Sequence, residues 1–130
     1  MTRSLLLVLL LAASTAARAD TPQQVLDTLS QQAGGSASAA RGEKLFRAKP
    51  TGGGETASCT SCHTDDAKAR GQHVKTHKEI EPLAPVANKE RFTDPAKVEK
   101  WFKRNCKEVL ARACTPQEKA DFTAYMLSVR

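Results

Sequence analysis

Two cysteines and a histidine at residues 59 to 63, in the order CTSCH, carry the clearest chemical signal in this 130-residue chain. Thiols at this spacing can add to the two vinyl groups of a haem, and the next side chain, His63, then lies beneath the iron. A zinc site would need a second close pair of ligands, and a thioredoxin-like motif follows a strand, whereas a glycine run at 52 to 54 precedes this one. We therefore predict one haem c, attached through Cys59 and Cys62 and ligated by His63.

The other two cysteines, Cys106 and Cys114, have no metal-ligand spacing. If thioether bonds consume the first pair, these are the two free thiols left in an oxidising compartment, and we expect them to form a disulfide. In the chain-entropy model, closing a loop of this length stabilises the fold by about 2–3 kcal/mol. We expect the bond to pin residues 106 to 114 into a small fixed loop.

The N-terminus indicates export. Arg3 precedes an apolar run over residues 5 to 13, and an Ala-x-Ala site ends at Ala19. This is the pattern of a secretory signal peptide, and the apolar run is too short to span a bilayer. We predict that residues 1–19 are removed by cleavage after Ala19, which leaves residues 20–130 as one monohaem cytochrome c domain in the periplasm.

The charge of the chain narrows the class of partner. The net charge is +6, and loss of Arg3 and Arg18 with the signal peptide leaves 18 basic and 14 acidic side chains, a modest excess of +4. No arginine stripe or set of stacking aromatics suits nucleic acid, so the positive charge indicates either steering toward an acidic protein partner or simply a solvated basic surface. The absence of a long apolar face in the sequence pattern favours a monomer.

Cap residues and apolar periodicity predict helices over most of the patterned segments, so we expect helices to hold the haem site. Thr21 and Asp94 are each a helix cap followed by proline, and Thr115 with Glu118 forms the pattern of a capping box. The segments 50–58 and 64–90 are predicted loops, so the fold class is all-α. The helices are expected at about 21–34, 38–48, 94–105 and 115–130.

Two of these helices have faces that suggest how they pack. The last helix carries an apolar face at the spacing i, i+3, i+4, i+7, formed by Phe122, Tyr125, Met126 and Val129. The small Gly42 of the second helix would allow a close crossing against Phe122 or Tyr125.

The helix that begins at Asp94 carries Val98, Trp101, Phe102 and Asn105 along one face. We expect Trp101 and Phe102 to pack against the haem. Asn105 lies one turn after Trp101, where a polar amide needs a partner. Capping of the helix C-terminus is one role that suits asparagine.

The sixth position on the iron has no obvious ligand. Met126 lies on a packing face, and Met1 leaves with the signal peptide. We therefore do not expect methionine as the sixth ligand, although ordinary electron-transfer cytochromes c use it. The stretch GQHVKTHKE is basic and polar, so we expect its two histidines to be solvent-exposed, with bis-histidine ligation as the runner-up. The candidates are His73, His77, Asn88, Asn105, a lysine, or no ligand.

Four segments resemble the sphaeroides haem protein family of high-spin c-type cytochromes: CTSCH, KEIEPLAP at 78–85, RFTDPAKVEKWFKRNC at 91–106 and CTPQEKADF at 114–122. The resemblance implies a small class I cytochrome c-like fold around one covalently bound haem. It also implies His63 and, in the ferric state, Asn105 as iron ligands, with the Cys106–Cys114 disulfide directly after the asparagine. On reduction the asparagine is expected to leave, so that the ferrous site binds oxygen or nitric oxide.

The resemblance further implies a small dihaem cytochrome c as electron donor, with a membrane cytochrome b upstream. We therefore expect haem binding, electron transfer and gas binding rather than catalysis. Two other functions would use the same site: a low-spin electron shuttle, and an enzyme such as a peroxidase or nitric oxide dioxygenase. An oxygen-activating enzyme needs a distal acid, base or arginine, and Arg91 and Arg104 are near in sequence.

Overall fold

The computed structural model describes residues 19–50, 56 and 58–130, so residues 1–18 of the predicted signal peptide and most of the glycine-rich segment lie outside it. The two short strands pair antiparallel, with Gly71 opposite Ile80 and Gln72 opposite Glu79. They form a hairpin within the stretch 64–90, which was predicted as loop throughout; the all-α fold class is otherwise confirmed. In chain order the elements are α1 (Pro22–Ala33), α2 (Ala39–Arg47), α3 (Thr60–His63), β1 (Gly71–Gln72), β2 (Glu79–Ile80), α4 (Pro95–Leu110) and α5 (Pro116–Ser128).

The predicted caps begin the three longest helices. At α1 the Thr21 hydroxyl accepts the Gln24 N–H at 3.2 Å, and the Gln24 side chain accepts the Thr21 N–H at 2.8 Å. Thr115 and Glu118 make the same reciprocal pair at α5. Asp94 accepts a backbone N–H from the first turn of α4 at 3.0 Å. Each cap satisfies N–H groups that a helix end otherwise leaves without a partner.

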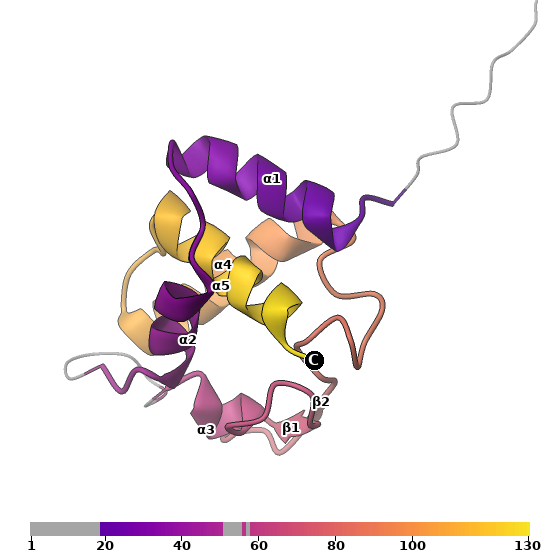
Figure 1. Ribbon diagram of the computed structural model, residues 1–130. Coiled ribbons are helices and arrows are strands. Elements are labelled where there is room, and N and C mark those ends of the chain that lie inside the picture. Colours follow the sequence, from indigo (N-terminus) through magenta and orange to yellow (C-terminus); the bar gives the residue numbers. More distant parts are fainter. Residues whose placement is uncertain (1–18, 51–55, 57) are drawn as a thin grey trace, which may run out of the picture.

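Helix α5 lies at the centre of the fold, with α1 and α2 against it, α4 behind it in this view, and α3 and the hairpin together at one end (Figure 1). Aromatic rings connect the helices. The Phe46 ring of α2 lies 5.7 Å from Tyr125 and 6.2 Å from Phe122, and Phe122 lies 5.7 Å from Phe102 of α4. These edge-on and tilted contacts are the favoured geometries of buried aromatic pairs.

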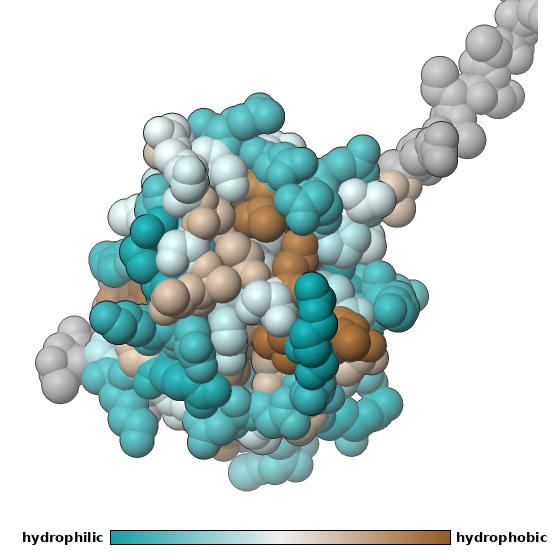
Figure 2. Space-filling model, viewed as in Figure 1, coloured by the Kyte–Doolittle hydropathy of each residue, from teal (hydrophilic) through white to brown (hydrophobic). Residues whose placement is uncertain are grey.

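The outer surface over α1, α2 and α5 is mostly hydrophilic, with smaller apolar areas between the polar side chains (Figure 2). Among the described residues, the large hydrophobic side chains that are exposed are Val74, Val86 and Trp101. No helix in this part of the chain is long and apolar enough to cross a membrane.

Gly42 allows α2 and α5 to cross closely, as its lack of a side chain predicts. A Cβ atom at this position would lie 1.9 Å from the carbonyl oxygen of Asp121 and 2.9 Å from Cβ of Tyr125. Because the nearest atoms belong to the α5 backbone, the two helices would have to separate to accept any side chain. The crossing therefore requires glycine for its lack of volume.

The same crossing is fixed by a buried carboxylate. Asp121 is 4% exposed and accepts hydrogen bonds from Ser38 N–H at 2.7 Å and from Arg41 at 2.6 and 2.8 Å. Gln117 donates a further bond at 2.9 Å. Burial alone would raise the pKa of Asp121, but these donors outweigh burial and hold the pKa below its ordinary value. The carboxylate therefore stays charged and ties the start of α2 to α5.

The Gly42→Ala substitution is expected to lower the free energy of unfolding by about 1–3 kcal/mol, because the added methyl group overpacks a backbone contact. Chemical denaturation followed by far-ultraviolet circular dichroism measures this. Gly35→Ala is the matched control, since its Cβ would meet only the flexible end of Gln117 at 3.3 Å. Equal unfolding free energies for the two variants would contradict the role of Gly42.

Candidate functional site

The CTSCH segment forms a single helical turn. The N–H groups of Cys62 and His63 donate to the Cys59 carbonyl at 3.3 and 3.1 Å. The Ser58 hydroxyl accepts the Ser61 N–H at 3.1 Å, which closes the start of the turn. Residues three apart lie on the same side of a helix. Local hydrogen bonds therefore place the two cysteines side by side.

The chemistry of the two thiols argues against a redox-active pair. Cys59 and Cys62 are not joined by a disulfide. Burial raises the pKa of Cys59 to about 11, whereas thioredoxin-like motifs lower the pKa of their reactive thiol. Among the described residues there is no group of three or more side chains able to hold a metal ion by itself. A cysteine of raised pKa with a second cysteine at the vinyl spacing fits thioether attachment to haem.

His63 is suited to bind iron. Burial, with a smaller contribution from the positive charge of Arg91, lowers the pKa of His63 to about 4. The imidazole is therefore neutral at physiological pH, which is the form that ligates metals.

Gly71 holds the hairpin against this turn, and sequence reasoning missed it. A Cβ atom on Gly71 would lie 2.0 Å from the Cys62 carbonyl oxygen and 3.0 Å from Cα of His63. Thr64, at φ 61°, turns the chain away from α3 so that it can return along β1. A lone glycine in a polar segment gives no sequence signal for this contact, because the partner is the backbone of another element.

A second loop borders the same region. The N–H groups of Leu83 and Ala84 both donate to the Ala67 carbonyl, at 3.0 and 2.9 Å. Arg91 donates to the carbonyls of Pro82 and Glu81, each at 2.7 Å. These bonds fix the PLAP segment beside the chain that leaves His63. The Arg91 guanidinium is thus engaged with backbone oxygens near the histidine, which argues against its role as a distal catalytic arginine.

The end of α4 is tied to the segment that leads into the CTSCH turn. Thr56 donates its N–H to the Glu108 carbonyl at 3.2 Å and its hydroxyl to the Glu108 carboxylate at 3.1 Å. The same carboxylate oxygen lies 3.3 Å from Nε2 of His73. Glu108 therefore joins three segments that are distant in sequence.

His73 is half-buried, so the prediction that it is solvent-exposed was wrong, whereas His77 is exposed as predicted. The Nδ1 atom of His73 accepts hydrogen bonds from the N–H groups of Lys75 and Thr76, both at 3.3 Å, within the same turn. Its Nε2 is buried against Glu108, with no well-directed hydrogen bond among the described residues. Both ring nitrogens are thus enclosed by the protein, which disfavours His73 as an iron ligand.

Asn105 does not cap α4, which corrects one of the roles considered for it. The helix continues to Leu110 and ends at Ala111, which adopts a left-handed conformation at φ 58°. Asn105 is an exposed residue on the penultimate full turn, and its side chain makes no hydrogen bond among the described residues. It is therefore available to bind a group outside the polypeptide.

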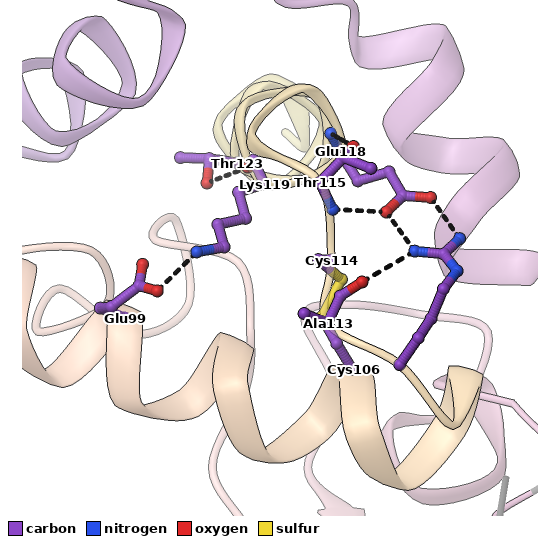
Figure 3. Close-up of a disulfide and its surroundings, with 9 residues drawn as sticks. Glu99, Cys106, Ala113, Cys114, Thr115, Glu118, Lys119 and Thr123 are labelled. Carbon is purple, nitrogen blue, oxygen red and sulfur yellow. Dashed lines mark hydrogen bonds and ion pairs between the residues drawn. A yellow bond between two sulfur atoms is a disulfide. The ribbon is translucent and has the colours of Figure 1, made fainter. Parts of the chain in front are cut away.

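The disulfide between Cys106 and Cys114 is confirmed, with a Cα–Cα distance of 5.5 Å. It joins the last turns of α4 to the residue before the α5 cap (Figure 3), so the irregular loop is shorter than the predicted 106–114. Arg112 donates two hydrogen bonds of 2.8 Å to Glu118 across the loop. The residue after Asn105 is thereby covalently anchored to the start of α5.

The other predicted candidates have different surroundings. Phe102 is buried against Phe122 in the core, whereas Trp101 is 40% exposed. Asn88 accepts the Glu90 N–H at 3.2 Å within its own turn. Met126 is fully buried, as its packing face predicts. Contact of Trp101 and Phe102 with the haem stays a prediction.

A helical fold built around a CxxCH turn, with two unpaired thiols followed by a neutral histidine, defines a c-type cytochrome. Residues 32–126 match the family described as a domain of unknown function, DUF1924. The chain is also 48% identical to cytochrome c-type protein SHP of Cereibacter sphaeroides over 127 residues, which are 97% of this chain and 98% of the relative. The chain belongs to this family of c-type cytochromes, whose members carry a covalently bound haem c.

Solved structures agree with this assignment. The structure of oxidised SHP, described as an oxygen-binding cytochrome c, is 50% identical and has a TM-score of 0.78, covering 82% of this chain and 96% of that one. The structure of oxidised cytochrome c'' from Methylophilus methylotrophus is 36% identical, with a TM-score of 0.74 and coverage of 84% and 94%. The small all-α cytochrome fold is thus confirmed by both.

The Gly71→Ala substitution is expected to reduce the haem content of the purified protein and to lower the free energy of unfolding by about 1–3 kcal/mol, because the methyl group would push β1 off the Cys62 carbonyl. The haem-to-protein ratio and denaturant unfolding measure the two effects. Substitution of the exposed neighbour, Gln72→Ala, is the control. Full haem content and unchanged stability in Gly71→Ala would contradict the proposed contact.

Proposed function

We propose that this chain is an exported, high-spin monohaem cytochrome c in which His63 and, in the ferric state, Asn105 would ligate the haem iron. A bound haem would supply reversible one-electron chemistry. Loss of the bond to Asn105 on reduction would let a small gas ligand, O2 or NO, bind. The function is gas binding coupled to electron transfer.

The observation that carries this proposal is the setting of Asn105. Its amide is exposed and unbonded on α4, directly before a disulfide cysteine. Three residues later, Glu108 joins α4 to Thr56, three residues before Cys59. The helix that carries Asn105 is therefore fastened to the segment that carries the haem thiols. Among the described residues the one methionine is Met126, which is fully buried in the core, and this disfavours methionine in place of Asn105.

The residue type explains why the bond would depend on the oxidation state. An amide oxygen is a neutral, hard and weak donor, which suits ferric iron better than the softer ferrous iron. Reduction therefore weakens the bond to Asn105, while the neutral imidazole of His63 suits both states. The disulfide and the Glu108 bonds hold the backbone, so the side chain can leave and return by rotation about its own bonds.

The relatives support gas binding and ligand release. The solved SHP structure is described as that of an oxygen-binding cytochrome c. A solution structure of Methylophilus methylotrophus cytochrome c'', 36% identical with a TM-score of 0.70, is described as giving insight into haem-ligand detachment. We extend both properties to this chain, with Asn105 as the ligand that detaches.

The proposal includes a compartment and partners. The signal-peptide pattern that ends at Ala19 supports cleavage there and a periplasmic location. The family resemblance supports a small dihaem cytochrome c as electron donor, with a membrane cytochrome b upstream. The enzyme reading, a peroxidase or nitric oxide dioxygenase, is less favoured because Arg91 is engaged with two carbonyl groups.

The Asn105→Ala variant is expected to change the ferric absorption spectrum and to leave the ferrous spectrum and carbon monoxide binding nearly unchanged. Azide should bind the ferric variant more tightly than wild type, because azide no longer has to displace Asn105. Each 1.4 kcal/mol of binding free energy between Asn105 and the iron corresponds to about a tenfold gain in azide affinity. Absorption titrations measure both effects, with Asn88→Ala as the control. A ferric spectrum that is unchanged in Asn105→Ala, or a low-spin ferrous protein that ignores carbon monoxide, would contradict the proposal.

The double variant Cys106→Ser and Cys114→Ser tests whether the disulfide guides the returning ligand. It is expected to lose about 2–3 kcal/mol of stability through the greater entropy of the unfolded chain. It should also recover the Asn105-ligated ferric spectrum more slowly after rapid oxidation, as measured by stopped-flow absorption. Unchanged recovery in a folded variant would show that the helix positions Asn105 without the disulfide.

A further inference from the structure

The solvent-facing side of α4 concentrates positive charge. Successive turns of the helix expose five basic side chains, while its opposite side buries Phe102, Cys106 and Val109. Residues three and four apart are neighbours on a helix surface, so the five form one continuous patch. We call this patch the α4 cationic face; it consists of Lys97, Lys100, Lys103, Arg104 and Lys107.

The charges of this face are not neutralised by the protein. No acidic side chain among the described residues pairs with any of the five. Elsewhere, arginines have partners: Arg41 pairs with Asp121, Arg70 with Glu79 and Glu81, and Arg112 with Glu118. On α4 itself, Glu99 is already paired with Lys119 of α5 at 2.5 Å (Figure 3).

The α4 cationic face carries many positive charges for a chain of modest net charge. Without residues 1–19 the chain has 18 basic and 14 acidic side chains. The five unpaired cations on one helix face therefore outnumber the net excess of +4 in residues 20–130. The other unpaired lysines among the described residues do not form such a row; they are Lys44 on α2, Lys49 just after it, Lys78 and Lys89.

An aromatic side chain lies at the edge of the same face. Trp101 is 40% exposed, and the Arg104 guanidinium lies 5.6 Å from the centre of its ring. Tryptophan and arginine are the residue types most enriched at the energetic centres of protein interfaces. Asn105, the proposed iron ligand, follows four residues after Trp101, which is about 6 Å along the axis. A partner that covered Trp101 would therefore lie about one turn from Asn105.

We propose that the α4 cationic face is the docking surface for the electron donor, and that the donor presents an acidic patch beside its own haem. This rests on the proposed function. One electron passes from a ferrous haem of the donor, which becomes ferric, to the ferric haem of this chain, which becomes ferrous, and no proton or atom is exchanged. Complementary charge increases the rate of encounter and fixes orientation.

The test compares two double variants of the full haem-loaded protein that change the net charge equally. Lys97→Glu with Lys100→Glu reverses charge on the α4 cationic face, at two positions that are distant from Asn105. Lys44→Glu with Lys49→Glu makes the same change on and after α2. The probe is the dihaem cytochrome c from the same cells. Calorimetric titration of the two oxidised proteins gives Kd, and stopped-flow mixing with the reduced donor gives the second-order rate constant.

The α4 variant is expected to bind at least about tenfold more weakly and to be reduced at least about tenfold more slowly at low ionic strength, while the α2 variant stays within about twofold of wild type. The difference between the α4 and α2 variants should vanish at about 0.5 M salt, where screening is strong. Equal losses in both variants would mean that only net charge steers the donor, and no loss in the α4 variant would mean that docking lies elsewhere. Either result overturns the proposal.

Failure of this proposal is distinguishable from failure of the proposed function. The ferric spectrum, azide affinity and carbon monoxide binding report on Asn105 without any protein partner. A chain that passes those assays but ignores charge reversal on α4 keeps its haem ligands and loses only this docking surface. Tight binding of the α4 cationic face to anionic vesicles or nucleic acid, with no effect on reduction by the donor, would also overturn the proposal.

Discussion

The backbone contact between Gly71 and the Cys62 carbonyl is the constraint on which the site depends. The helical turn that follows Cys59 and contains Cys62 and His63 is four residues long, too short to hold its own orientation. It is positioned by what packs on it, and the hairpin approaches closely enough that any side chain would be excluded. The hydrogen bonds of Ala67 and Arg91 hold the loop that follows the hairpin beside this turn. Burial and the positive charge of Arg91 lower the pKa of His63, so its imidazole stays neutral.

The opposite side of the site is held by a different kind of connection. Glu108 and the Cys106–Cys114 bond fix the end of α4 by one polar and one covalent link on the two sides of the helix. A weak ligand such as an amide gains little energy from its metal bond, so the backbone around it must already be in place. The fixed helix end and the exposed Asn105 side chain therefore suit the ligand role that we propose for this residue.

Much of this architecture could be predicted from local sequence. The CTSCH motif, the caps at Thr21, Asp94 and Thr115, and the small Gly42 can each be recognised from a few residues. The structure confirms the caps and Gly42, and the relatives confirm a covalently bound haem c. The end of α4 could not be predicted, because Ala111 adopts a left-handed conformation that usually needs glycine or asparagine. The Gly71 contact and the burial of His73 against Glu108 depend on segments far apart in sequence, for which composition and periodicity give no signal.

The crossing of α2 and α5 has a consequence for the local stability of the protein. Gly42, Phe46 and Asp121 join these helices through contacts that involve no residue of the CTSCH turn. Parts of a protein that share few contacts can open separately. A local opening of the CTSCH turn therefore leaves the crossing of α2 and α5 in place.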